Sequence, residues 1–143
     1  MDATDWMQGG RDLARIGVIP TAANNPPNSG MNIVNNFINA YGVNATYINI
    51  TTTSGNANDA ALAALVGQMT GIFIVGGEQL RLTCTYTPGG VDTLVMAAVR
   101  QVLRNGGMVA GTSAGTGCQV QSPPIKTGRR FYFILPSIAS GRI

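Results

Sequence analysis

The residues best suited to chemistry lie in one short segment, Gly111-Thr-Ser-Ala-Gly115. It fits the Gly-x-Ser-x-Gly pattern of a nucleophile elbow, in which a serine occupies a sharp turn between a strand and a helix. Glycines at both flanks lack the Cβ atoms that would collide as the chain folds back. The turn presents the Ser113 hydroxyl above the carboxyl edge of the sheet, where the amides of the following helix favour a developing oxyanion. We therefore predict that Ser113 is a nucleophile. The alternative is an ordinary serine in a glycine-rich turn.

A second glycine pair, Gly76-Gly77, directly follows a fully apolar run. Two glycines at such a point let a ligand approach the backbone and expose amide donors. Because the carboxyl ends of parallel strands meet at one edge, this loop and the elbow should open on the same crevice. Amides near Gly77 and Ala114 could then form the two halves of an oxyanion hole. A dinucleotide site is disfavoured, because neither glycine cluster has the Gly-x-Gly-x-x-Gly spacing.

The sequence contains no histidine. Within these residues, that excludes a histidine-ligated metal site and any mechanism with a histidine base. We predict neither a metal nor a cofactor. The two cysteines, Cys84 and Cys118, cannot form a structural zinc site alone. They are predicted to be small buried core residues, and a disulfide between them is the less favoured alternative.

Alternating strands and helices should position these groups. Apolar or alternating runs predict strands at 16–19, 45–50, 71–75 and 108–110, and the run 71–75 is typical of a central parallel strand covered on both faces. Helical spacing predicts helices at 31–41, which Gly42 ends, from Asn58 or Asp59 to about Gln68, and at 91–104. The segment 78–90 is predicted to be a loop with at most one helical turn, and a further helix should begin near Ala114. This order predicts an α/β fold with a mainly parallel sheet and helices on both sides.

Composition narrows the class of protein. A length of 143 residues allows one domain, with 45% hydrophobic and 10% charged side chains. No run approaches the roughly 18 apolar residues of a membrane span. The net charge of +3 arises from four basic residues between 126 and 142, because the preceding residues carry five basic and six acidic side chains. A nucleic-acid partner is therefore not expected, since it would require a basic patch on the folded body.

Two further features bear on processing and on the end of the chain. Residues 1–128 read as part of one domain and residues 129–143 as an atypical tail, which is either a strand over 131–135 or sequence foreign to the domain.

Asn44-Ala-Thr46 and Asn49-Ile-Thr51 match the N-glycosylation pattern, although an ordinary Asn- and Thr-rich composition is the favoured explanation. The first ten residues lack the basic start of a secretory signal, so localisation is left open between cytoplasm and secretion.

Two longer blocks carry a resemblance to a known family. Residues 69–83, which include Ile-Val-Gly-Gly-Glu-Gln-Leu-Arg-Leu, and residues 107–115, Gly-Met-Val-Ala-Gly-Thr-Ser-Ala-Gly, resemble the two signature blocks of cyanophycinase and its relatives. These are serine peptidases that also include the aspartyl dipeptidases. Residues 16–23 resemble the early strand and loop of the family, and the likeness covers about residues 6–128.

The resemblance implies a three-layer α/β/α sandwich like that of the class I glutamine amidotransferases, a flavodoxin-like arrangement. It implies a Ser-His-Glu triad that hydrolyses peptide bonds next to aspartyl residues, with β-aspartyl-arginine units as substrates in the cyanophycinases proper. By position, Ser113 matches the nucleophile. Gly77, Glu78 and Ala114 match the backbone oxyanion positions, and Gln79 matches a substrate-binding one. Glu78 departs from the aspartate usual in cyanophycinases, a change that a backbone donor would tolerate.

The larger departure is the missing half of the triad. The family continues well beyond the elbow, and that later part supplies the histidine and the acid. Here Glu78 is the sole glutamate and lies on the wrong loop. We expect a fragment of a cyanophycinase-like peptidase whose C-terminal part is missing, nearly inert by itself, with homodimer formation left open for a full-length parent. The alternative is a non-catalytic α/β protein that binds a small molecule or peptide.

Overall fold

The computed structural model describes residues 11–54 and 56–117. Expectations that fall on other residues, including the tail at 129–143 and Cys118, lie outside the described part. The elements in chain order are η2 (Arg11–Leu13), β1 (Arg15–Ile19), α1 (Pro26–Tyr41), β2 (Asn44–Tyr47), α2 (Ala60–Gly67), β3 (Gly71–Ile74), α3 (Gln79–Tyr86), η3 (Pro88–Gly90), α4 (Leu94–Arg104), β4 (Met108–Gly111) and α5 (Ala114–Gly117), where η marks a short 3-10 turn.

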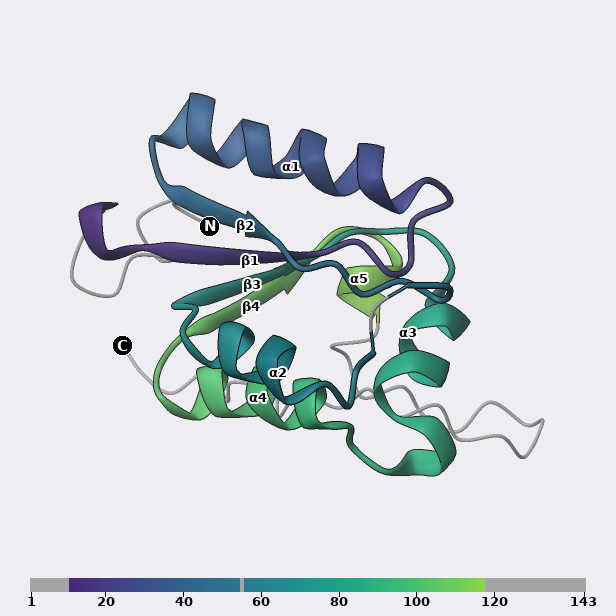
Figure 1. The fold of residues 1–143 in the computed structure, drawn as a ribbon. Coiled ribbons are helices and arrows are strands. Elements are labelled where there is room, and N and C mark those ends of the chain that lie inside the picture. The colour runs from purple at the N-terminus through teal and green to yellow at the C-terminus, as the bar shows by residue number, and fades with distance from the viewer. Residues whose placement is uncertain (1–10, 55, 118–143) are drawn as a thin grey trace, which may run out of the picture.

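The four strands of the described part form one parallel sheet in the order β2-β1-β3-β4 (Figure 1). Gly17 of β1 pairs with Thr46 on one side and with Ile72 on the other. This order matches the first four strands of a flavodoxin-like sheet, in which the chain reverses direction across the sheet between the first and third strands. The predicted α/β fold with a parallel sheet is confirmed.

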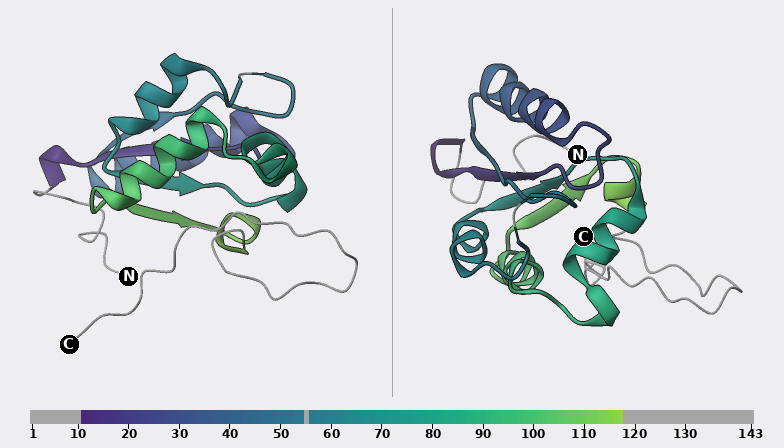
Figure 2. Two further views of the ribbon diagram at one scale, coloured as in Figure 1. Left: turned by 90° about the horizontal axis from the view of Figure 1, so that it is seen from below. Right: turned by 45° about the vertical axis from the view of Figure 1, so that its right-hand side comes forward.

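Helices cover both faces of the sheet. Helix α1 lies on one face, and α2 and α4 pack side by side on the other (Figures 1 and 2). Strand β3 contributes to the cores on both faces of the sheet. Ile72 and Ile74 belong to the core that includes residues of α2 and α4, whereas Phe73, together with Val75 directly after the strand, belongs to the core beneath α1. Burial of each such isoleucine contributes roughly 1.5–3 kcal/mol of hydrophobic stabilisation. The predicted central strand covered on both faces is confirmed.

Helix α1 begins earlier than its apolar spacing predicts. It starts at Pro26 rather than Met31, because Pro26 and Pro27 suit the first turn of a helix, where no amide partner is required. The Asn25 side chain caps this end by accepting a hydrogen bond from the Asn28 N–H (3.3 Å). At the other end Gly42 adopts a left-handed conformation, as predicted.

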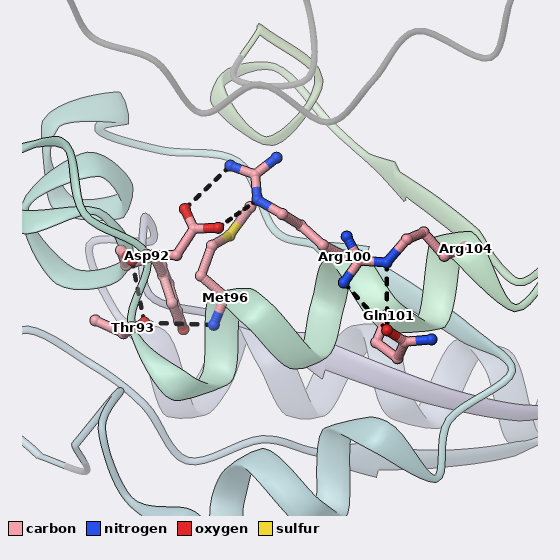
Figure 3. A network of polar contacts seen from close by, with 7 residues as sticks. Asp92, Thr93, Met96, Arg100, Gln101 and Arg104 are labelled. Atoms are coloured by element: carbon pink, nitrogen blue, oxygen red, sulfur yellow. Dashed lines mark hydrogen bonds and ion pairs between the residues drawn. The ribbon is translucent and has the colours of Figure 1, made fainter.

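The caps of α2 and α4 fix the layer on the opposite face. Asp59 Oδ1 accepts hydrogen bonds from the first amides of α2, as predicted for an N-cap. Helix α4 begins at Leu94, because Thr93 caps it by accepting from the Met96 N–H (3.3 Å). Figure 3 shows this cap beside the ion pair between Asp92 and Arg100 (2.6 Å). Leu94 itself, the first residue of α4, is exposed.

Two sequence-based boundaries also require correction. The strand predicted at 45–50 is shorter, because β2 ends at Tyr47 and the buried Ile48 and Ile50 belong to the following loop. The loop predicted at 78–90 contains the helix α3. Its inward side chains are Leu82, Thr83 and Tyr86.

Cys84 is exposed, contrary to the prediction that it is a core residue. The reason is the geometry of α3, because Leu82 and Tyr86 are one turn apart and face the core while position 84 falls on the opposite side.

No helix in the described part is long and apolar enough to cross a membrane.

Candidate active site

Three loops meet at the carboxyl edge of the sheet, one after each of β1, β3 and β4. Residues 20–25 follow β1, residues 76–78 follow β3, and the Gly-x-Ser-x-Gly turn follows β4. The change of direction in the strand order lies between β1 and β3, and α/β proteins bind their ligands at this point. The loops that carry the predicted functional residues therefore lie beside the expected crevice.

Ser113 occupies a strained turn. Its φ is +50°, and it is the one non-glycine residue of the described part with a positive φ. Such a conformation costs roughly 1–3 kcal/mol and persists where the surroundings enforce it. Gly115 permits the close approach of this turn to β3, since a Cβ there would collide with the carbonyl oxygen of Ile74. A Cβ on Gly111 would lie 2.7 Å from the Gly115 carbonyl carbon, so both flanking glycines are needed for the chain to fold back.

The turn is closed by its own hydrogen bonds. The Ser113 carbonyl oxygen accepts from the amides of Thr116 (2.9 Å) and Gly117 (2.8 Å), and Thr116 Oγ1 donates to the Gly111 carbonyl oxygen (2.5 Å). The Ser113 side chain is exposed at the protein surface. A serine held in this way is accessible to a substrate while its backbone is fixed.

Backbone amides near Ser113 differ in their availability. The N–H groups of Gly77 and Ala114 donate to no acceptor within residues 11–54 and 56–117. The N–H of Glu78 is already used, because it donates to the Ala22 carbonyl oxygen (2.8 Å). In this structure the Glu78 amide is thus engaged, whereas the amides of Gly77 and Ala114 have no acceptor in the described part.

The side chains of Glu78 and Gln79 have separate surroundings. Glu78 Oε1 accepts from the Leu80 N–H (3.1 Å) and so caps α3. Gln79 is exposed and reaches toward α5, where its Oε1 lies 3.6 Å from the position that a Cβ on Gly117 would take. The structure therefore brings Gln79 close to the helix that follows Ser113, although the two residues are far apart in sequence.

The loop after β3 touches the elbow directly. Gly76 N–H donates to Thr112 Oγ1 (3.1 Å), and a Cβ on Gly76 would lie 3.1 Å from the Ser113 Cβ. Sequence reasoning did not single out Thr112, because nothing in the Gly-x-Ser-x-Gly pattern specifies the residue before the serine. Its hydroxyl can be recognised as a link only when β3 and β4 are known to be neighbours.

The loop after β1 is held against the loop after β3. Arg81 Nη1 donates to the carbonyl oxygens of Ala22 (3.2 Å) and Ala23 (2.7 Å). Gly77 lies so close to Ala22 that a Cβ would overlap its carbonyl oxygen, and its φ of +147° also favours glycine. Arg81 was likewise missed, and its position in the first of the two signature-like blocks, three residues after Glu78, was the available signal.

A buried tyrosine supports the loop after β1 from the protein interior. Tyr86 is fully buried, and its hydroxyl lies 2.7 Å from Thr21 Oγ1. Because Thr21 donates its only hydroxyl proton to the Ile50 carbonyl oxygen, Tyr86 must be the donor to Thr21. Burial raises the pKa of Tyr86, so the group stays neutral at physiological pH.

The described part of this site contains no set of metal ligands. Among the described residues no group of three or more His, Cys, Asp or Glu side chains could hold a metal ion. The site offers an exposed serine hydroxyl, two backbone amides with no acceptor among residues 11–54 and 56–117, and an exposed amide side chain.

A parallel α/β sheet with a strained serine turn at its carboxyl edge is the arrangement of an α/β-type serine hydrolase. The comparison with protein families agrees with this class. The model of peptidase family S51 matches residues 4–128, and the chain belongs to this family. It is a family of serine peptidases, the one that contains the cyanophycinases and aspartyl dipeptidases, so membership places the chain among the hydrolases.

Proposed function

We propose that this chain carries the nucleophile and oxyanion half of a serine peptidase that cleaves bonds next to aspartyl residues, such as β-aspartyl-arginine. The observation that carries the proposal is the strained Ser113, held in the elbow near the amides of Gly77 and Ala114, which have no acceptor in the described part of the chain. Family membership supports the reaction class, and the resemblance of the two sequence blocks supports the substrate.

In this mechanism Ser113 Oγ attacks the carbonyl carbon next to the aspartyl residue, and its proton passes to a base. The carbonyl oxygen becomes an oxyanion, which Gly77 and Ala114 stabilise with their N–H groups. One such donor typically contributes about 10²–10³ in rate. Gln79 orients the substrate from the adjacent surface. The tetrahedral intermediate then collapses as the C–N bond breaks and the leaving amine takes up the proton, and water hydrolyses the remaining ester on Ser113.

A histidine base is the component that these residues do not supply. No histidine occurs among the 143 residues. In serine proteases, loss of the histidine removes up to about 10⁶ in rate, because the serine hydroxyl is a poor nucleophile at neutral pH. We infer that this chain alone is nearly inert and that the base belongs to residues outside this sequence.

Chemical rescue tests the proposal. A fluorophosphonate probe reacts when serine Oγ bonds to phosphorus, fluoride leaves and the serine proton goes to a base. We expect slow labelling of Ser113, which accelerates when free imidazole is added and slows again as the pH is lowered and imidazole becomes protonated. Ser113→Ala should label under no condition and keep its circular dichroism spectrum. Rapid labelling without imidazole would show that another base is within reach, and no labelling with imidazole would refute an intact half-site.

The absence of histidine also favours a second function, a binding protein that retains the crevice without the chemistry. Calorimetric titration with β-aspartyl-arginine distinguishes the two. Binding that persists in a chain which imidazole cannot rescue supports the binding protein. Binding accompanied by rescued labelling supports the peptidase.

A further inference from the structure

Thr112 connects the two halves of the candidate site. It lies immediately before Ser113, and its Oγ1 accepts a hydrogen bond from the Gly76 N–H (3.1 Å). The two residues are 36 positions apart in sequence and lie just after the adjacent parallel strands β4 and β3. This is the hydrogen bond by which a side chain of the elbow contacts the loop that carries the unpaired Gly77 amide.

The backbone of Thr112 is fixed independently of this bond. Its N–H donates to the Ile74 carbonyl oxygen (3.2 Å), and its carbonyl oxygen accepts from the Gly115 N–H (2.9 Å). The side-chain oxygen therefore projects from a rigid turn. Gly76 has no comparable support, because its N–H donates to Thr112 Oγ1 alone among the described acceptors.

The position of Gly76 determines the direction of the next peptide group, which contains the Gly77 N–H. Gly76 and Gly77 are the most freely rotating residues available, so an unrestrained loop would sample many orientations of this amide. Enzymes gain from donors that are oriented before the reaction, since no reorganisation is then needed when charge develops. The acceptor on Thr112 provides such orientation.

We propose that Thr112 is a positioning residue that holds the Gly76-Gly77 loop so that the Gly77 N–H faces the developing oxyanion at Ser113. This inference rests on the proposed peptidase function for its catalytic consequence. Its structural half, orientation of the loop by the Thr112 hydroxyl, stands on the hydrogen bond itself. The residue touches no reacting atom and acts through Gly76.

The test compares Thr112→Val, which removes the acceptor at nearly constant shape, with Thr112→Ser, which restores it. Thr46→Val on β2, the strand farthest from β4 in the sheet, is the control for replacing a threonine hydroxyl with a methyl group. Amide exchange and chemical shifts of Gly76 and Gly77 are measured by NMR. Labelling of Ser113 by the fluorophosphonate is measured with imidazole present.

In Thr112→Val we expect the Gly76 amide to exchange at least about tenfold faster, the Gly77 amide resonance to shift, and rescued labelling to slow by about tenfold, equivalent to about 1.4 kcal/mol. Thr112→Ser and Thr46→Val should behave like the unmodified chain. Unchanged Gly76 exchange in Thr112→Val would overturn the proposal. Faster exchange with unchanged labelling would also overturn it, since Thr112 would then be merely structural.

Failure of the peptidase function is separately visible. It would appear as absent labelling in the unmodified chain even with imidazole. In that case the Gly77 amide resonance tests the positioning role of Thr112. A shift of this resonance in Thr112→Val that is absent in Thr112→Ser supports the role, and an unchanged resonance in Thr112→Val refutes it.

Discussion

The replacement Gly77→Ala should be the most damaging glycine substitution in the loop after β3. Two penalties act at this position. The φ of +147° lies outside the range that residues with a Cβ readily adopt, and the new methyl group would overlap the Ala22 carbonyl oxygen. The loop can relieve the overlap only by moving away from the loop after β1.

The magnitude follows from what such a movement would break. The hydrogen bond from Glu78 N–H to Ala22 is worth about 1 kcal/mol, and the two from the half-buried Arg81 about 1 kcal/mol each after allowance for solvent. Backbone strain adds roughly 1–3 kcal/mol where the loop does not move. If the loop moves, the three hydrogen bonds are lost, and if it stays, the strain and the overlap with Ala22 remain. In either case we expect a net loss of about 3–4 kcal/mol. That is a large part of the roughly 5–15 kcal/mol that stabilises a typical domain.

Two matched glycines separate the contributions. Gly89 has a φ of +63° but no atom within 4 Å of the position that a Cβ would take, so Gly89→Ala tests backbone strain alone and should cost about 1–2 kcal/mol. Gly67 ends α2 with no neighbour within 4 Å and no positive φ. Gly67→Ala should be neutral or stabilise the chain by up to about 1 kcal/mol, because alanine has the higher helix propensity.

Urea denaturation followed by far-ultraviolet circular dichroism measures all three variants. The midpoint concentrations should rank Gly67→Ala highest and Gly77→Ala lowest, with similar slopes if the denatured state is unchanged. A Gly77→Ala variant no less stable than Gly89→Ala would refute the reasoning, because contact with Ala22 would then contribute nothing.

Three further predictions concern other parts of the molecule. Because the pKa of Tyr86 is raised above 10.0, the contribution of this group to stability should be constant below about pH 10 and be lost above it by up to about 1.4 kcal/mol per pH unit; Tyr86→Phe should therefore show a shallower fall above pH 10, and an equal fall in urea midpoints would contradict this. Arg81→Gln should lower the free energy of unfolding by about 1–2 kcal/mol, whereas the exposed Arg104→Gln should change it by less than about 0.5 kcal/mol; equal effects would show that the carbonyl contacts of Arg81 are inconsequential. Mass spectrometry of protein from its native source should find Asn44 and Asn49 without glycan, and an added glycan mass on either would indicate passage through a secretory pathway.

The sequence alone determined the layer architecture and the chemical candidate. Apolar runs such as 71–75 indicate buried parallel strands because only a strand covered on both faces is apolar throughout. The Gly-x-Ser-x-Gly pattern identified Ser113 because the glycines satisfy a local requirement of the turn. Asp59 and Gly42 were likewise predictable, since helix caps depend on residues within one turn.

The tertiary structure decided what depends on neighbours distant in sequence. Helix α3 was missed because its β-branched threonines have weak helix propensity, and it is stabilised instead by burial of Leu82 and Tyr86 against the core. The same packing turns Cys84 outward. The engagement of the Glu78 amide by Ala22, and of the Gly76 amide by Thr112, depends on loops from different strands meeting at one edge of the sheet. A local pattern can nominate a nucleophile, but only the assembled sheet determines which amides remain free beside it, because each amide is satisfied or left unpaired by partners that the neighbouring sequence does not contain.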